Sequence, residues 1–293
     1  MKKYRKSIAM ATLALFAFSG MAGAREMIQI KGSDTLINLV QKLAEEYMEQ
    51  KSGVAIAVTG GGSGTGIAAL MNKKTDIANA SRLMKPKEVT RAMDRGITPK
   101  RVVIAMDGLS VIVNGSNTVE GLTMDQIGKI FRGEVTNWSE VGGEDLPITL
   151  YGRQSNSGTF VFFRDVVLKG DYASAMRRMN GNSQIVEAVK ADKTGIGYVG
   201  VGYVKNAKGV NVLKVAAYAG APYASPLDSQ DVKSGKYPIA RPLNQYLNGA
   251  PEGKVRDFIL FELSPEGQRT VEEEGFFPIP KEYIEFNKKS VGL

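Results

Sequence analysis

The sequence predicts an α/β protein in which mainly parallel sheets are covered by helices on both faces. Strand-like and helical segments alternate along most of the 293-residue chain. The segment 54–59 is mostly apolar, as expected for a strand that is buried on both faces. Apolar residues make up 43% of the chain and charged residues 23%, which suits a packed core in one or two domains.

The first half of the chain shows the alternation most clearly. A strand over 28–30 leads to an amphipathic helix that Gly53 ends. The apolar face of that helix comprises Leu36, Leu39, Val40, Leu43 and Tyr47. The other elements expected here are a strand over 54–59, a short helical run from Ile67, a strand with its exit loop over 76–82, a helix that Pro86 starts and that ends before Gly96, and strands over 102–106 and 109–114.

The second half continues with a helix that Thr123 caps and Gly133 ends. Residues 220–238 are rich in Pro, Ser and Asp and are expected to form a loop or linker. The other elements expected are strands over 148–151, 195–203, 210–217 and 239–247, helices over 160–168 and 183–191, and two terminal helices over 252–263 and 265–274.

Residues 1–24 have the pattern of a secretory signal peptide. Four basic residues lie within the first six positions, an apolar stretch covers 8–18, and Ala22-Gly23-Ala24 is a small-residue cleavage site. The alternative, a membrane anchor, fits poorly because the apolar stretch is too short to span a bilayer. We therefore expect a periplasmic protein. Because the sequence has no cysteine, disulfides and a lipidated cysteine are excluded.

The formal net charge is +8, and removal of the four basic residues of the leader leaves +4. This modest excess favours either attraction of an anion or solubility. Beyond the leader, no dense run of Lys and Arg occurs, and no aromatic residues are interleaved with such a run. Nucleic acid is therefore not expected as a partner.

Three loops share one pattern, in which a strand is followed by Gly with Ser or Thr and then by a helix. Such loops gather at the C-terminal ends of parallel strands, where helix N-termini offer unpaired N–H groups to an anion. Each loop alone is also typical of ordinary helix capping, but three alike, one beside Arg153, favour binding of a small oxyanion. The loops are Gly32-Ser33-Asp34-Thr35, Gly62-Ser63-Gly64-Thr65-Gly66 and Ser157-Gly158-Thr159.

The residue types argue against catalysis and against a cofactor. The chain has no histidine, which excludes a Ser–His pair and His-ligated metals. No Gly-Lys-Ser/Thr follows the glycines, so nucleotide hydrolysis is not indicated. The run 272–274 is interpreted as a solvated helix end rather than a metal site, and Trp138 as a packing anchor rather than a ligand platform. Asp76 and Asp107 are candidates for a carboxylate pair, although the sequence gives no proximity.

Four segments carry a family resemblance: 153–160, 130–138, 195–198 and 62–64. Through them the chain resembles the secreted phosphate-binding proteins of bacterial phosphate ABC transporters, over essentially the whole mature length. The resemblance implies two α/β lobes joined by two hinge crossings, the first near 109–114 and the return within 217–240, with the anion between the lobes. The expected lobe 1 comprises 26–112 and 238–293, and the expected lobe 2 comprises 113–237.

The resemblance also implies which groups bind phosphate. In the first lobe they are the Thr35 hydroxyl, the Leu36 N–H and the Ser63 hydroxyl, with Ser33 close by. In the second lobe they are the side chains of Arg153, Ser157 and Thr159 and the N–H of Gly158.

Two departures affect the expected selectivity. Some family members carry an Asp that accepts the proton of phosphate where this chain has Arg82, and an Asp that pairs with the binding Arg where this chain has Ser155. A carboxylate acceptor rejects sulfate, which has no proton to donate at neutral pH. Selectivity for phosphate over sulfate is thus open at this point, as is whether Asp34 replaces the missing acceptor. We expect Arg82 to contact the anion as a second guanidinium, the alternative being a surface charge.

The expected function is capture of inorganic phosphate by a monomeric, non-enzymatic protein that delivers it to a membrane permease. The first alternative keeps the fold and changes the oxyanion to sulfate, molybdate or tungstate. The others are a secreted phosphatase and an adhesin or matrix protein.

Overall fold

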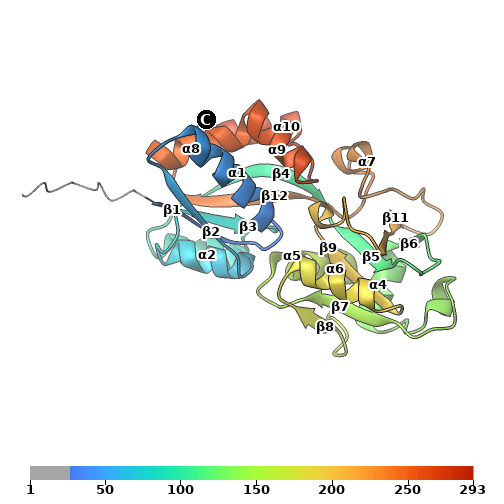
Figure 1. The fold of residues 1–293 in the computed structure, drawn as a ribbon. Coiled ribbons are helices and arrows are strands. Elements are labelled where there is room, and N and C mark those ends of the chain that lie inside the picture. The colour runs from blue at the N-terminus through green and yellow to red at the C-terminus, as the bar shows by residue number, and fades with distance from the viewer. Residues whose placement is uncertain (1–26, 293) are drawn as a thin grey trace, which may run out of the picture.

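The computed structural model describes residues 27–292 of the chain. The predicted signal peptide, 1–24, lies outside the described residues. Two lobes are visible side by side, each built on its own sheet with helices against it (Figure 1). Within residues 27–292, every helix falls short of the length and apolarity that a membrane crossing requires.

The sheet of lobe 1 has the strand order β2-β1-β3-β12-β4. Strand β1 is parallel to β2 and β3, whereas β12 is antiparallel to both β3 and β4. The sheet is thus mixed, and the strands that the Gly–Ser/Thr loops follow are its parallel members. The strands are β1 (Met27–Gly32), β2 (Ala55–Thr59), β3 (Ile77–Ala80), β4 (Pro99–Gly108) and β12 (Ala240–Asn248).

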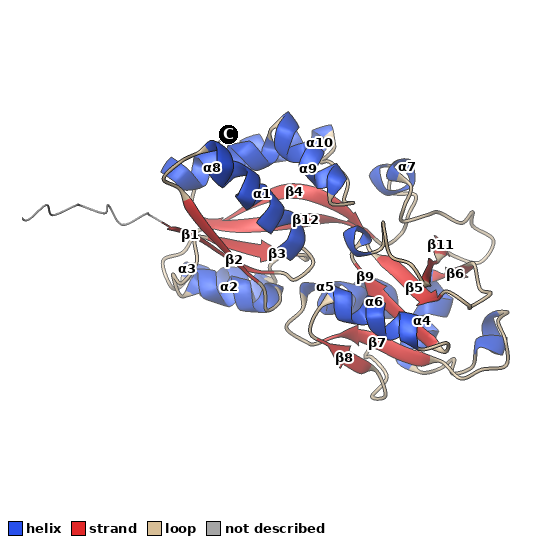
Figure 2. Ribbon diagram, in the orientation of Figure 1, coloured by secondary structure: helices blue, strands red, loops and turns tan. Residues whose placement is uncertain are grey.

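Helices cover both faces of this sheet. Figure 2 shows α1, α8, α9 and α10 on one face and α2 and α3 on the other. The apolar stripe expected on the first helix is its buried face, where Leu39 and Leu43 are fully buried. The helices are α1 (Ile37–Gln50), α2 (Ser63–Met71), α3 (Pro86–Met93), α8 (Gly253–Leu263), α9 (Pro265–Glu273) and α10 (Lys281–Val291).

The sequence predicted two terminal helices, but the structure has a third, α10. This helix is mostly polar, and its buried residues are Asn287 and Val291. The Asn287 side chain accepts a hydrogen bond from the Val103 N–H at 2.9 Å and donates to the Val103 carbonyl at 2.8 Å. The helix therefore docks on β4 partly through an amide, which apolar periodicity does not reveal.

The main sheet of lobe 2 has the strand order β10-β5-β9-β7-β8, and β11 pairs with β6 in a small second sheet. Strand β7 is parallel to β8 and β9, whereas β5 is antiparallel to β9 and β10. The strands are β5 (Ser110–Asn114), β6 (Gly121–Thr123), β7 (Thr149–Arg153), β8 (Arg177–Met179), β9 (Gly195–Val199), β10 (Val210–Val212) and β11 (Lys214–Ala216).

Lobe 2 contains both short and regular helices. Helix α4 starts and ends as predicted, because Thr123 and Gln126 form a reciprocal capping box and Gly133 has the left-handed conformation that ends it. The helices are α4 (Met124–Arg132), α5 (Gly158–Phe163), α6 (Asn182–Ala191), α7 (Ser229–Lys233), the 3₁₀ turns η1 (Trp138–Val141) and η3 (Val201–Tyr203), and the π-helical turn η2 (Arg164–Leu168).

Three predictions for lobe 2 were wrong in detail. The expected strand 195–203 ends at Val199, and Val201–Tyr203 form the 3₁₀ turn η3 instead. The expected strand 210–217 is divided at Leu213, because β10 pairs with β5 and β11 pairs with β6 in the other sheet. The expected loop 220–238 contains helix α7, which Asp228 caps by accepting the Gln230 N–H at 2.7 Å.

The chain crosses between the lobes at two adjacent points. A single residue, Leu109, separates β4 from β5, and its N–H donates to the carbonyl of Ile239 at 3.2 Å, just before β12. The outgoing and returning segments therefore lie side by side. The expected boundary at 112/113 falls inside β5, while that at 237/238 falls just before β12.

Candidate functional site

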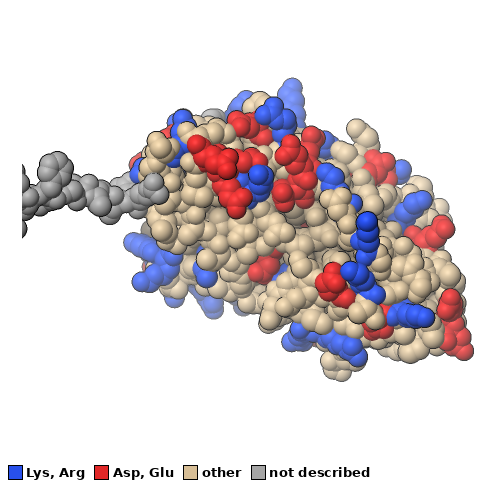
Figure 3. Space-filling model, viewed as in Figure 1, with Lys and Arg blue, Asp and Glu red and all other residues tan. Residues whose placement is uncertain are grey.

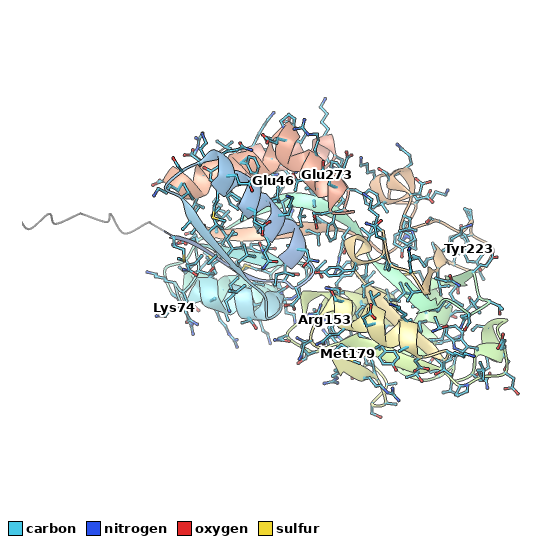
Figure 4. The ribbon with its side chains drawn as sticks, in the orientation of Figure 1. Glu46, Lys74, Arg153, Met179, Tyr223 and Glu273 are labelled. Carbon is cyan, nitrogen blue, oxygen red and sulfur yellow. The ribbon has the colours of Figure 1, made fainter. Side chains whose placement is uncertain are left out.

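The candidate site lies where the two lobes meet. Strands β1, β2 and β3 are parallel, so the loops after them emerge at one edge of the sheet, and this edge faces the loop after β7 in lobe 2. Arg153, the last residue of β7, is labelled in Figure 4 on the side of lobe 2 that faces lobe 1. The three Gly–Ser/Thr loops predicted to converge are therefore brought together.

Five buried hydroxyls form one hydrogen-bonded group, here called the hydroxyl cluster: Ser33, Thr35, Ser63, Ser81 and Thr159. The Thr35 and Thr159 hydroxyls lie 2.9 Å apart across the lobes. Within lobe 1, the Ser33 hydroxyl donates to that of Ser81 at 3.0 Å. The Ser81 oxygen in turn lies 3.3 Å from Thr159 and 3.4 Å from Ser63. The cluster thus joins three loops of lobe 1 to the start of α5.

Glycine is required at the start of α5 because of this close approach. A Cβ atom at Gly158 would lie 2.2 Å from the Ser63 Oγ and 2.8 Å from the Ser81 Oγ. Ser157, buried beside it, caps α5 by accepting the Phe160 N–H at 3.3 Å. The N-terminus of α5 therefore lies directly against the hydroxyl cluster, with the partial positive charge of a helix start.

Arg153 is fully buried and reaches across the lobes. Its Nη2 donates to a carboxylate oxygen of Asp34 in lobe 1 and to the Asn180 carbonyl at 2.9 Å. The second oxygen of Asp34 accepts the Gly61 N–H at 2.7 Å. Within the described residues, Nε and Nη1 of Arg153 are buried without a hydrogen-bond partner. Unpaired buried donors are rare in proteins, so these two nitrogens mark a place for an acceptor.

A second buried guanidinium, which the sequence did not reveal, borders the hydroxyl cluster. Arg241 on β12 lies directly opposite Asp107 on β4. Its Nε and Nη2 donate to Asp107 Oδ2 at 2.9 and 2.8 Å, and its Nη1 donates to the Ser81 carbonyl at 3.0 Å. Nη2 also donates to the Thr159 hydroxyl at 3.1 Å. Burial lowers the pKa of Arg241, and Asp107 opposes that shift.

A signal for this pair did exist in the sequence. Asp107 lies between two expected strands and Arg241 lies within another, so both charges were placed in or beside strands of the expected sheets. A charge in a buried strand needs a partner, but 134 positions separate the two residues, and only the sheet order makes them neighbours.

The predicted contact of Arg82 with the anion is not supported. Its Nη1 and Nη2 donate to the two carboxylate oxygens of Glu88, both at 2.7 Å, and Nη1 also donates to the Leu83 carbonyl at 2.8 Å. Glu88 lies in the first turn of α3, where Pro86 starts the helix six residues after β3 ends. A planar guanidinium forms two parallel hydrogen bonds with a carboxylate, and Glu88 accepts both of these bonds from Arg82. We therefore leave Arg82 out of the proposed site.

The remaining predicted residues have clear positions. The Leu36 N–H donates to the Ser33 carbonyl at 3.1 Å, which closes the turn before α1. Trp138 is buried, as expected of a packing anchor, and its Nε1 donates to the Thr194 carbonyl at 3.1 Å. Asp76 and Asp107 do not form a pair, because Asp76 precedes β3 at the opposite edge of the sheet and binds the Gln29 N–H at 2.7 Å.

On the face shown in Figure 3, acidic and basic side chains occur on both lobes. Figure 3 shows acidic side chains gathered over α1 and α9 of lobe 1, the region in which Figure 4 labels Glu46 and Glu273. The face in view therefore carries charges of both signs rather than a uniformly positive surface.

Comparison with known proteins identifies the family. Residues 19–266 match the family described as the PBP superfamily domain. The chain is 33% identical to the phosphate-binding protein PstS of Pseudomonas aeruginosa, over 96% of this chain and 91% of the relative. This chain belongs to the PBP superfamily and to its PstS family. It is also 31% identical to PstS of Borreliella burgdorferi, over 87% of this chain and 90% of that protein.

Solved structures agree with the membership in the PstS family. A Clostridium perfringens protein, assigned as a phosphate ABC transporter substrate-binding protein and solved with bound phosphate, superposes with a TM-score of 0.77. The two chains are 29% identical, over 87% of this chain and 100% of that one. An ABC-type phosphate transport receptor from Vibrio cholerae gives a TM-score of 0.70 at 28% identity, over 86% of this chain and 100% of that one. These matches agree with the predicted two-lobed α/β fold.

Proposed function

We propose that this protein captures inorganic phosphate between its two lobes and delivers it to an ABC-type phosphate importer. The PstS relatives and the phosphate-containing structure support the choice of ligand. The geometry supports it through one observation, which is that the groups at the lobe interface are arranged to donate hydrogen bonds.

The hydroxyl groups are fixed as donors by their neighbours. The Ser63 oxygen accepts the Ser81 N–H at 3.1 Å, and the Ser157 oxygen accepts the Phe160 N–H at 3.3 Å. The Thr159 oxygen accepts an N–H of Arg241. Because N–H groups only donate, each of these hydroxyls keeps its own hydrogen for another acceptor. Together with Nε and Nη1 of Arg153, they suit a small oxyanion and not a cation.

Closure of the lobes is the expected mechanism of capture. Besides the Thr35–Thr159 contact, the Tyr203 hydroxyl donates to the Asp34 carbonyl at 2.6 Å, and the Asn156 amide donates to the Gly61 carbonyl at 2.8 Å. An anion bound by Ser63 of lobe 1 and by Arg153 of lobe 2 would favour the closed arrangement, because it contacts both lobes only there. The importer would then recognise the closed shape.

Asp34 is the acceptor we propose for the proton of phosphate. Its carboxylate lies on Arg153, beside the nitrogens that would bind the anion. Each Asp34 oxygen accepts one hydrogen bond, from Arg153 or from the Gly61 N–H. The second nearby carboxylate, Asp107, has less capacity left, because its Oδ2 accepts two N–H groups of Arg241 and its Oδ1 accepts the Val201 N–H at 2.9 Å. Sulfate has no proton to donate to Asp34, so we expect phosphate to be preferred.

The cellular setting belongs to the same proposal. The predicted leader over 1–24 supports export to the periplasm, and we propose that the protein acts there as a monomer without enzymatic activity. The absence of histidine from the sequence argues against phosphatase chemistry of the Ser–His or His–metal type.

Titration calorimetry on the purified mature protein tests the function. One phosphate is expected to bind per chain, with sulfate a weak competitor, and an aryl phosphate is expected to remain uncleaved. Absence of binding heat from phosphate and from every other small oxyanion would refute the proposal. Tighter binding of sulfate, molybdate or tungstate would keep the fold and change the ligand.

A further inference from the structure

The Asp107–Arg241 pair lies at the two crossings between the lobes. Asp107 is the second-last residue of β4, just before the outgoing crossing, and Arg241 is the second residue of β12, just after the return. Both side chains are at most 2% exposed. On its other side, the Arg241 guanidinium lies 5.1 Å from the centre of the Phe162 ring of α5. The guanidinium is therefore held between the hinge strands and lobe 2.

Asp107 keeps this guanidinium in a single orientation. One carboxylate oxygen, Oδ2, accepts from both Nε and Nη2 of Arg241. The other, Oδ1, accepts the Val201 N–H of lobe 2 at 2.9 Å. The Ser81 carbonyl holds Nη1 at 3.0 Å. With three of its five N–H groups engaged in this way, the guanidinium directs the second N–H of Nη2 at the Thr159 hydroxyl, 3.1 Å away.

This N–H determines what Thr159 is able to bind. A hydroxyl has one hydrogen to donate and two lone pairs that accept. Arg241 occupies one lone pair and cannot accept in return, so the Thr159 hydrogen has to go elsewhere. Its other neighbours are the hydroxyls of Thr35 and Ser81, at 2.9 and 3.3 Å. An anion oxygen that takes the place of these hydroxyls would receive the Thr159 hydrogen.

We propose that Arg241, held by Asp107, is a positioning residue that sets the Thr159 hydroxyl as a hydrogen-bond donor to the bound oxyanion. This inference rests on the proposed function. Arg241 acts through Thr159 and links the hinge strands to the anion. We expect the oxygen that Thr159 binds to be an unprotonated one, because a charged oxygen accepts a hydrogen bond more strongly than a P–OH group does.

Two changes made together test the inference without leaving a buried charge unpaired. The double variant Asp107→Asn/Arg241→Gln removes both charges. Its phosphate affinity is measured by calorimetry in three backgrounds: wild-type Thr159, Thr159→Ser, which keeps the hydroxyl, and Thr159→Val, which removes it. The charge-neutral variant Arg132→Gln/Glu134→Gln, from a partly exposed ion pair of lobe 2, is the matched control.

The expected result is a loss of phosphate affinity that depends on the presence of a hydroxyl at position 159. The double variant is expected to weaken phosphate binding by about tenfold with Thr159 or Ser and by less than about twofold with Val. The Arg132/Glu134 control is expected to bind like the wild type. Equal costs in all three backgrounds would mean that the pair only stabilises the fold, and no cost in any background would equally overturn the inference.

Folding of the variants is checked by thermal unfolding and circular dichroism. If the double variant does not fold, Arg241→Lys replaces it in the same three backgrounds, because lysine keeps the charge beside Asp107 but loses the planar fork. The same dependence on the hydroxyl is expected, and equal costs would again overturn the inference. Failure of the wild type to bind phosphate would instead refute the proposed function.

Discussion

The hydroxyls of Thr35 and Thr159 lie 2.9 Å apart, although 124 positions of sequence and the boundary between the two lobes separate them. Thr35 follows β1 of lobe 1, and Thr159 is the second residue of α5 in lobe 2. Neither hydroxyl is exposed to solvent to any appreciable extent. The two lobes therefore contribute to one polar site. A ligand that contacts both hydroxyls binds only when the lobes are closed.

Replacement of Arg153 by alanine is expected to weaken phosphate binding by at least about 30-fold, equivalent to about 2 kcal/mol. The change removes the two buried nitrogens that lack partners and leaves the anion without its charged donor. Calorimetry measures the effect, and Arg132→Ala on the surface of lobe 2 is the control. An unchanged affinity would place the site elsewhere.

Gly158→Ala is expected to weaken phosphate binding by more than about tenfold while lobe 2 stays folded. The added Cβ would lie 2.2 Å from the Ser63 Oγ, so the lobes could not close to the observed distance. Small-angle scattering with phosphate present measures closure, and calorimetry measures affinity. Gly181→Ala is the matched control, because a Cβ at that position has no atom within 4 Å. Equal behaviour of the two variants would contradict the close approach at α5.

Arg82→Gln is expected to change phosphate affinity by less than about twofold and to lower the free energy of unfolding by about 1–2 kcal/mol. The substitution breaks the paired bonds to Glu88, and the hydrogen bonds of the Arg82 side chain go to Glu88 and Leu83 rather than to the hydroxyl cluster. Calorimetry and denaturant unfolding separate the two effects, with Glu88→Gln expected to behave alike. A large loss of affinity in Arg82→Gln alone would restore Arg82 to the anion site.

Asp34→Asn is expected to reduce the preference for phosphate over sulfate by about tenfold. The asparagine side chain cannot accept a proton as a carboxylate does, and it no longer repels the oxygens of sulfate. The measurement is competition binding of the two anions at neutral pH, with Asp76→Asn, at the opposite edge of the sheet, as the control. If the ratio of the two affinities stays constant, selectivity has another origin.

Glu262 gives lobe 1 a pH dependence of stability. Burial raises the pKa of this carboxyl from 4.5 to about 8, and a hydrogen bond from Gln245 opposes that shift. Between these values the folded chain holds a proton that the unfolded chain releases. The free energy of unfolding therefore falls as the pH rises, by up to about 1.4 kcal/mol per pH unit, and levels off above the folded pKa.

Glu262→Gln is expected to flatten this dependence and to raise the free energy of unfolding at pH 8. Denaturant unfolding at several pH values between 4.5 and 8 measures it, and the exposed Glu285→Gln is the control. An identical pH profile in Glu262→Gln and the wild type would show that Glu262 does not titrate in this range.

The sequence by itself determined the α/β class, most element positions and the loops that meet at the site. Local interactions decide these features: Thr123 and Gln126 cap α4, and Gly133 ends it. Gly32 at the end of β1 and Gly61 and Gly62 after β2 adopt positive φ angles that other residues rarely reach. The residues chosen through the family resemblance, such as Thr35, Ser63, Arg153 and Thr159, are brought to one place in the structure. Their binding of phosphate remains a prediction.

Only the tertiary structure decided how the charged groups are paired. Arg82 pairs with Glu88, six positions away in the sequence. Arg153 pairs with Asp34 of the other lobe. Arg241 pairs with Asp107 because their strands are neighbours in the sheet. A buried guanidinium binds whichever carboxylate the packed chain places within reach, and that distance depends on sheet order and lobe closure rather than on spacing along the chain. Helix α10 was not predicted for the same reason. It is held against β4 by the side-chain amide of Asn287, which binds Val103, 184 positions away in the sequence.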